Sequence, residues 1–160
     1  MHLIPFVALF RVQAIAETRT ITTRGDAALP DDAYALAEAY CGDPHCDCRR
    51  VMLNILGQRQ GHVATISFGF ERDGEMAGPF LDPLNPQRAF AGVLLRLVTQ
   101  VLADPAYVAR LEAHYSQVKG ITAAPTPAVR EVMAQWGVGE EPKLPRVGRS
   151  RWKKLQRRKR

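Results

Sequence analysis

One short stretch of this chain holds all three of its cysteines, and it constrains the fold more than any other feature. Cys41, Cys46 and Cys48 follow the spacing C-x4-C-x-C, with His45 beside the second cysteine. A tight turn over 42–44 would bring the first cysteine back toward the other two. Zinc is usually held by four thiolates or imidazoles in a structural site, and it is the default ion for a thiolate-rich site. The spacing therefore predicts that the three thiolates share one zinc ion.

Three cysteines leave one ligand to come from elsewhere in the chain. We expect His114, on a predicted helix that would fold back over the cluster, to be this ligand, with His45 as the alternative. A hydrogen-bonded histidine on a helix surface accounts for His114 equally well. Asp43 and Asp47 also carry ligand oxygens, but aspartates in turns more often bond the backbone of the turn.

The thiols have other interpretations. A disulfide is disfavoured, because the number of cysteines is odd and a bridge between Cys46 and Cys48 would be strained. Cysteine also serves as a small buried hydrophobe. Thiol redox chemistry is a further alternative, because Arg49 and Arg50 would lower a thiol pKa, although the strand-and-helix context of thioredoxin is missing. If only three protein ligands held the zinc, an open position could activate water, as in a hydrolase-like metalloenzyme.

The rest of the chain predicts one α+β domain of ordinary size. The length of 160 residues is that of a single domain, and 46% hydrophobic residues suffice for a core. We expect a compact domain over residues 1–138, with a small antiparallel sheet of one strand plus a β-hairpin packed against three to four helices. The expected elements are a strand or short helix within 3–16, a strand over 15–24, a helix over 29–40, hairpin strands over 51–56 and 62–70, and helices over 86–103, 104–119 and 126–136.

Proline and glycine positions set the predicted helix ends. Asn85, Asp104 and Thr126 each precede a proline, which is the pattern of an N-cap followed by the first helical residue. Gly120 and Gly137 are expected to end two of these helices. In the hairpin, alternation places His62 on the core face.

Composition points to a cytoplasmic protein without a membrane span. No apolar run reaches the roughly 18–20 residues that a span needs. The apolar start at 3–10 differs from a signal peptide, because no Lys or Arg precedes it and Arg11 and Gln13 interrupt it. Common nucleotide-binding and hydrolase motifs are absent from the sequence, so the sequence does not indicate a particular reaction.

The net charge of +6 is unevenly distributed. Residues 143–160 contain ten Lys and Arg and no acid, whereas the other 12 basic and 16 acidic residues give the rest of the chain a net charge of −4. We expect 139–160 to be a flexible, disordered basic tail that contacts nucleic acid, with a merely solvated extension as the alternative. The expected contact residues are Arg149, Arg151, Trp152, Lys153, Lys154, Arg157 and Arg158, with Trp152 stacking on a base.

Several motifs together resemble an uncharacterised bacterial family whose members are often labelled SEC-C-motif or metal-binding proteins. The resemblance covers about residues 36–119 and rests on the segment from Tyr40 to Val51, the strand ending at 64–67, the segment over 81–87, and the helix over 104–115. In the tail, the segment over 147–150 resembles the lead-in of the zinc-binding SEC-C motif, but every cysteine of that motif is missing. The resemblance implies metal binding by the cysteine cluster and no known reaction.

Overall fold

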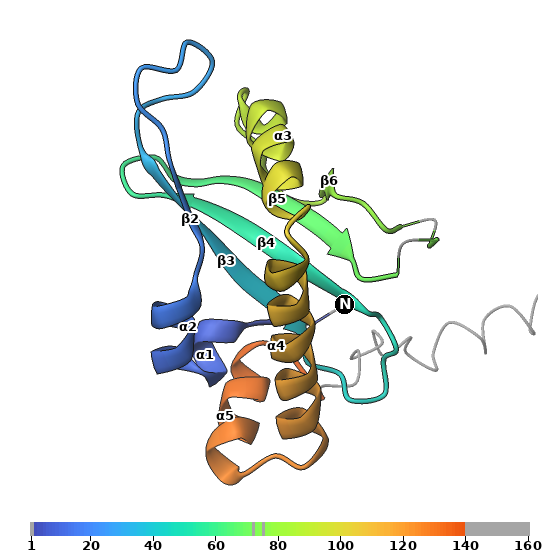
Figure 1. The fold of residues 1–160 in the computed structure, drawn as a ribbon. Helices are drawn as coiled ribbons and strands as arrows, with labels where there is room; N and C mark the ends of the chain where they lie inside the picture. The colour runs from blue at the N-terminus through green and yellow to red at the C-terminus, as the bar shows by residue number, and fades with distance from the viewer. Residues whose placement is uncertain (1, 72, 75, 140–160) are drawn as a thin grey trace, which may run out of the picture.

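The structure is a computed structural model, and it describes residues 2–71, 73–74 and 76–139. In this part of the chain, six strands form one antiparallel sheet and five helices accompany it, which confirms the α+β class (Figure 1). The strands are β1 (Leu3–Pro5), β2 (Thr20–Thr22), β3 (Ala33–Cys41), β4 (Arg50–Gly57), β5 (Gly61–Gly69) and β6 (Phe80–Leu81). The helices are α1 (Phe6–Leu9), α2 (Arg11–Glu17), α3 (Ala91–Val101), α4 (Pro105–Ala123) and α5 (Pro127–Gln135).

The strands follow the order β1-β3-β4-β5-β6, and β2 pairs with the same edge of β3 as β1. β1 pairs with one end of β3, and β2 pairs with the other end. The short helices α1 and α2 connect these two strands. The predicted strand over 15–24 is therefore only partly right, because residues up to Glu17 belong to α2 and only Thr20–Thr22 pair with the sheet.

The helix predicted over 29–40 is wrong, because these residues form β3, a strand near the middle of the sheet. Tyr34, Leu36 and Tyr40 fit both a helical and an alternating pattern, and the alanines between them suit either. The pairing of this segment with β4, in which Leu36 lies opposite Ile55, makes it a strand. Asp32 does not open a helix. Its carboxylate instead accepts the backbone N–H groups of the β4–β5 turn, at 3.0 Å from Arg59 and 3.1 Å from Gln60.

The predicted hairpin is confirmed as β4 and β5, with a shorter loop because Gly57 and Gly61 already pair. A register shift between Ile55 and Leu56 places His62 opposite Leu56. His62 is consequently exposed rather than in the core, contrary to the prediction from simple alternation.

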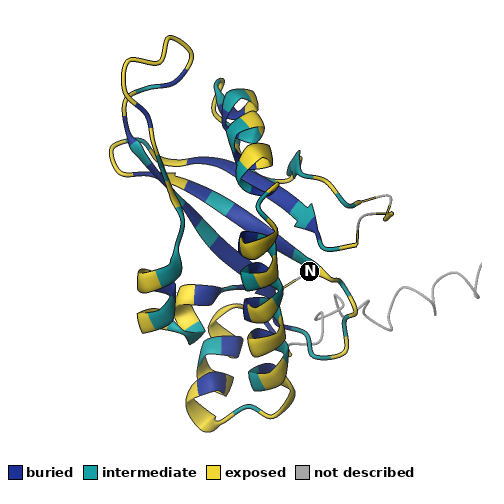
Figure 2. Cartoon of the chain, in the orientation of Figure 1, coloured by how far each residue is buried: buried dark blue, intermediate teal, exposed yellow. Residues whose placement is uncertain are grey.

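The main core lies between one face of the sheet and the helices α3 and α4 (Figures 1 and 2). The largest of its buried sheet residues are Tyr34, Leu36, Tyr40, Leu53, Ile55 and Ile66, and the helices add Leu94, Val98, Tyr107, Leu111 and Val118. A smaller cluster of Ile4, Val129, Met133 and Val138 packs α5 against β1. Burial of these apolar surfaces is the main stabilising contribution to such a fold.

Two of the three predicted helix starts are confirmed. Asp104 accepts a hydrogen bond from the N–H of Ala106, and Thr126 accepts one from the N–H of Val129. The third is wrong, since α3 begins at Ala91. The segment before it runs along the edge of β5, where the Gln87 side chain bonds both the N–H and the C=O of Thr65.

Gly137 has a φ of 70° just after α5, as expected of a glycine that ends a helix. The predicted stop at Gly120 is wrong, because α4 continues to Ala123. Within the described ranges no single helix is long and apolar enough to cross a membrane, and the pair α3–α4, which passes that test only jointly, is bent by 96°. The predicted contact residues of the basic tail lie outside the part of the chain that the structure describes.

Candidate metal centre

The structure brings the three cysteines together at one end of the sheet. Cys41 is the last residue of β3, and Cys48 lies two residues before β4 begins. Their potential ligand atoms and that of Cys46 all lie within 4.8 Å of one another, and all three thiols are free. Cys41 is buried and the other two are half-buried. This grouping is what the C-x4-C-x-C spacing predicted.

The loop between β3 and β4 is held by its own backbone and by close packing. The N–H of Cys46 donates to the C=O of Asp43 at 3.3 Å, and the N–H of Gly42 donates to the C=O of His2 at 3.0 Å. A side chain at position 42 would collide with Ile4 and would lie 2.8 Å from Cγ2 of Val138. A glycine is therefore required where the chain leaves Cys41 and passes the smaller core.

Lys119 of α4 holds this loop through two hydrogen bonds. Its ammonium donates to the C=O of Asp43 at 2.6 Å and to the C=O of Cys46 at 2.8 Å. The same ammonium lies 5.5 Å from the centre of the Tyr115 ring. One side chain thus fixes two points of the loop and adds a positive charge beside the thiols. Sequence reasoning missed Lys119, because backbone carbonyls 73 and 76 positions away leave no pattern in the sequence.

The pKa values of two of the thiols, Cys46 and Cys48, shift in opposite directions. Hydrogen bonding from Cys48 lowers the pKa of Cys46, and the charge of Lys119 acts in the same direction. Burial, followed by the proximity of Cys46 and Cys41, raises the pKa of Cys48 to about 12. Burial and the charge of Cys48 also raise the pKa of Tyr115. A second thiolate in this group therefore requires a nearby cation to offset its charge.

The structure does not bring His114 to the cysteines. Its ring lies 4.1 Å from the ring of Phe6 in a stacked arrangement, and only 1% of the residue is exposed. Nδ1 lies 2.7 Å from Oε2 of Glu38, and Nε2 lies 2.6 Å from Oε2 of Glu17. Because both ring nitrogens face carboxylates, His114 has none left for a metal in this arrangement.

The other candidate ligands, His45, Asp43 and Asp47, also lie outside the group of thiols. His45 is exposed, and its N–H bonds the Asp43 carboxylate at 2.9 Å, so Asp43 has the turn role considered from the sequence. Asp47 is exposed between the two cysteines. Among the residues that the structure describes, the group of metal-ligating atoms at this place consists of the three thiols.

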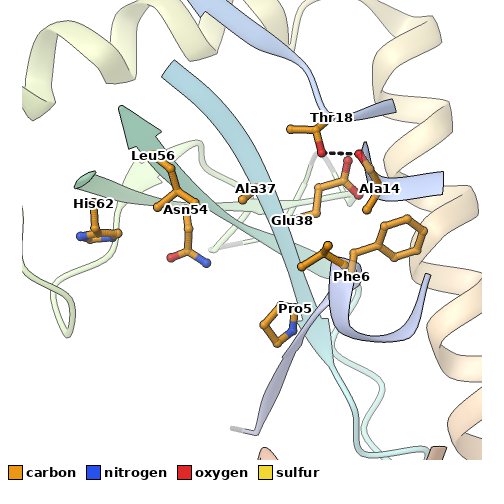
Figure 3. Close-up of a pocket in the computed structure, with 10 residues that line it drawn as sticks. Pro5, Phe6, Ala14, Thr18, Ala37, Glu38, Asn54, Leu56 and His62 are labelled. Atoms are coloured by element: carbon orange, nitrogen blue, oxygen red, sulfur yellow. Dashed lines mark hydrogen bonds between the residues drawn. The ribbon is translucent and has the colours of Figure 1, made fainter. Parts of the chain in front are cut away.

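A separate cavity of about 250 Å³ lies at the edge of β3, away from the cysteines. In Figure 3, Phe6, Ala14 and Glu38 lie to one side of β3, and Asn54 and His62 lie to the other. The ionisable side chains that line it are already hydrogen-bonded. His62 bonds Thr65, and Glu38 bonds Tyr40 and His114. Within the described residues, the cysteine group is the place where the structure brings three potential metal ligands together.

No family model, curated protein or solved structure matches this chain significantly. The functional interpretation accordingly rests on the chemistry and geometry of the cysteine group.

Proposed function

We propose that this protein binds one zinc ion through Cys41, Cys46 and Cys48 and that the ion has a structural role. The observation that carries the proposal is the convergence of three free thiols to within 4.8 Å. Thiolates are the ligands that zinc prefers in structural sites, and a divalent ion would offset the charge that the thiols acquire on ionisation. In a reducing, cytoplasmic compartment the thiols would remain available for it.

The structural role follows from where the thiols lie. Cys41 ends β3, and Cys48 comes just before β4, so an ion shared by them closes the loop between neighbouring strands. Because the three thiols converge in the folded chain, the binding free energy of the ion would add to the stability of the fold. The site also adjoins Lys119 of α4, so it would link the sheet to the long helix.

The test is elemental analysis of the purified protein beside variants in which each cysteine is replaced by serine. We expect about one zinc per wild-type chain and loss of the metal in Cys41→Ser, Cys46→Ser and Cys48→Ser. Asp47→Ser is the matched control, because Asp47 is exposed between two of the cysteines and does not belong to the group. Chelation should lower the melting temperature of the wild type. A metal-free protein with full stability in chelator would refute the proposal.

We propose as a second function that the basic tail contacts nucleic acid. The supporting observation is the charge distribution, with ten Lys and Arg in residues 143–160 and a net charge of −4 in the rest of the chain. Such a segment binds phosphates by releasing counterions, with little dependence on sequence.

A further inference from the structure

We infer that the protein supplies only three ligands to this ion and that a small thiol from solution occupies the fourth position. The inference rests on the proposed zinc site and adds the donor set and the ligand class. A tetrahedral ion bound by three protein ligands keeps one position for an external group.

The sequence restricts where a fourth nitrogen or sulfur ligand can come from. The chain has three cysteines and the four histidines His2, His45, His62 and His114, and all of them lie in the described part of the chain. His114 is bonded to two carboxylates. His62 pairs with Leu56 near the turn of the hairpin, whereas the cysteines lie at its opposite end, and Nε2 of His62 is 2.8 Å from Oγ1 of Thr65.

The two remaining histidines flank the cysteine loop without joining it. The carbonyl of His2 accepts the N–H of Gly42, but the ring of His2 lies against Gly137, where a Cβ atom would be 3.2 Å from Nδ1. His45 is exposed, and its backbone is fixed by Asp43. Neither ring contributes to the group of atoms within 4.8 Å. A fourth nitrogen ligand from the protein would thus require one of these rings to leave its place, and the carboxylates of Asp43 and Asp47 also lie outside the group.

Solvent reaches the group from the side of Cys48. This residue lines an open cavity of about 440 Å³ together with Arg49, Arg50 and Glu71. Arg49 pairs with Glu71 at 3.3 Å, and Arg50 donates to the C=O of Met76, so the walls are held in place. The cavity is large enough for a small molecule to approach the ion beside Cys48.

Donor softness selects the class of this ligand. Zinc with three thiolates carries one negative charge, which the ammonium of Lys119 beside Cys46 offsets. The cavity wall is charge-balanced, because Asp47 and Glu71 lie beside Arg49 and Arg50, so it does not exclude a bound thiolate. An ion already held by soft thiolates accepts a further soft donor readily, and small thiols are plentiful in a reducing compartment. These properties favour a low-molecular-weight thiol, bound as its thiolate with release of a proton and displacement of water.

The test replaces zinc by Co²⁺ in the full-length protein, because the visible spectrum of Co²⁺ reports its donor set. Titration with 2-mercaptoethanol should intensify and shift the thiolate-to-cobalt band, with saturation at about one thiol per cobalt. His45→Ala and His2→Ala are the matched variants. Each should give the wild-type spectrum before the thiol is added and the same shift afterwards.

The outcomes separate the two proposals. A Co²⁺ spectrum that ignores the thiol, or that changes in His45→Ala or His2→Ala before thiol is added, would overturn the inference and leave the metal site in place. Failure of the wild type to bind either Zn²⁺ or Co²⁺ would overturn the metal site and, with it, the inference.

Discussion

Among the salt bridges of the described residues, His114 is the most deeply buried member. It bridges Glu38 on β3 and Glu17 on α2, and the hydroxyl of Tyr40 donates to the same oxygen of Glu38 at 2.7 Å. Buried charges cost several kcal/mol each unless partners offset them, so each member of the network depends on the others. The network thus joins α2, β3 and α4.

Replacement of His114 by glutamine should destabilise the fold by about 3 kcal/mol, because it leaves the Glu38 carboxylate without its cationic partner. Burial alone would lower the pKa of His114, but hydrogen bonds and charges from Glu38 and Glu17 outweigh burial and raise it above 6.5. A raised pKa means that the protonated histidine stabilises the native state. This contribution is complete below the unfolded value of 6.5 and is lost as pH rises through the higher folded value.

The measurement is urea unfolding of wild type and His114→Gln at about pH 5.5 and about pH 8.5. At both values Glu17, whose pKa lies below 4.5 because of hydrogen bonds from Gln13 and His114, is ionised. The wild type should lose stability between the two pH values relative to the variant. Parallel changes in both proteins would show that the histidine does not titrate with folding.

The cysteine group and this network differ in how far the sequence could predict them. The three cysteines are close in sequence, so a turn suffices to bring them together. The partners of His114 lie 76 and 97 positions away. They also fall in segments that local patterns assign to the wrong element, Glu38 to a helix and Glu17 to a strand. Local spacing carries no information about contacts of this range.

At the level of elements, the hairpin and the helices α4 and α5 were predictable because turn and cap residues mark them directly. β3 was not, because alanines alternate with its large residues and suit a helix as well as a strand. Its identity depends on pairing with β1, β2 and β4, all of them antiparallel neighbours. Strand propensity is largely a matter of such neighbours, so a single segment cannot reveal it.

α4 continues past Gly120 to Ala123, and this leads to a prediction about the helix. Gly120 is exposed inside α4, its φ is not positive, and a Cβ atom there would meet nothing within 4 Å. Gly120→Ala should therefore stabilise the protein by about 0.5–1 kcal/mol, because alanine loses less backbone entropy in a helix. Urea unfolding would show a higher midpoint with an unchanged slope.

The matched control is Gly42→Ala. A Cβ atom at position 42 would collide with Ile4 and Val138, so this variant should lose about 1–3 kcal/mol through overpacking. A destabilised Gly120→Ala would mean that α4 does end near this residue in solution, as the sequence pattern alone predicted.

For the whole molecule, positive charge is concentrated in residues 143–160. The described residues up to Gly139 contain both core clusters and the cysteine group. The chain outside residues 143–160 has a net charge of −4 and would repel phosphate. Any affinity for nucleic acid should therefore depend on the ten cations of the last 18 residues.

Removal of residues 143–160 should abolish nucleic-acid binding and leave zinc binding unchanged. If about six of the cations contact phosphates, the slope of log affinity against log salt would be about −5 on duplex DNA, and a fourfold rise in salt would weaken binding by about a thousandfold. Binding should hardly depend on base sequence, because phosphate contacts carry no sequence information directly. The measurement is a salt titration of the full chain and of a 1–142 fragment against the same labelled duplex and single strand. Equal binding by fragment and full chain, or no binding by either at low salt, would assign the tail a role other than nucleic-acid contact.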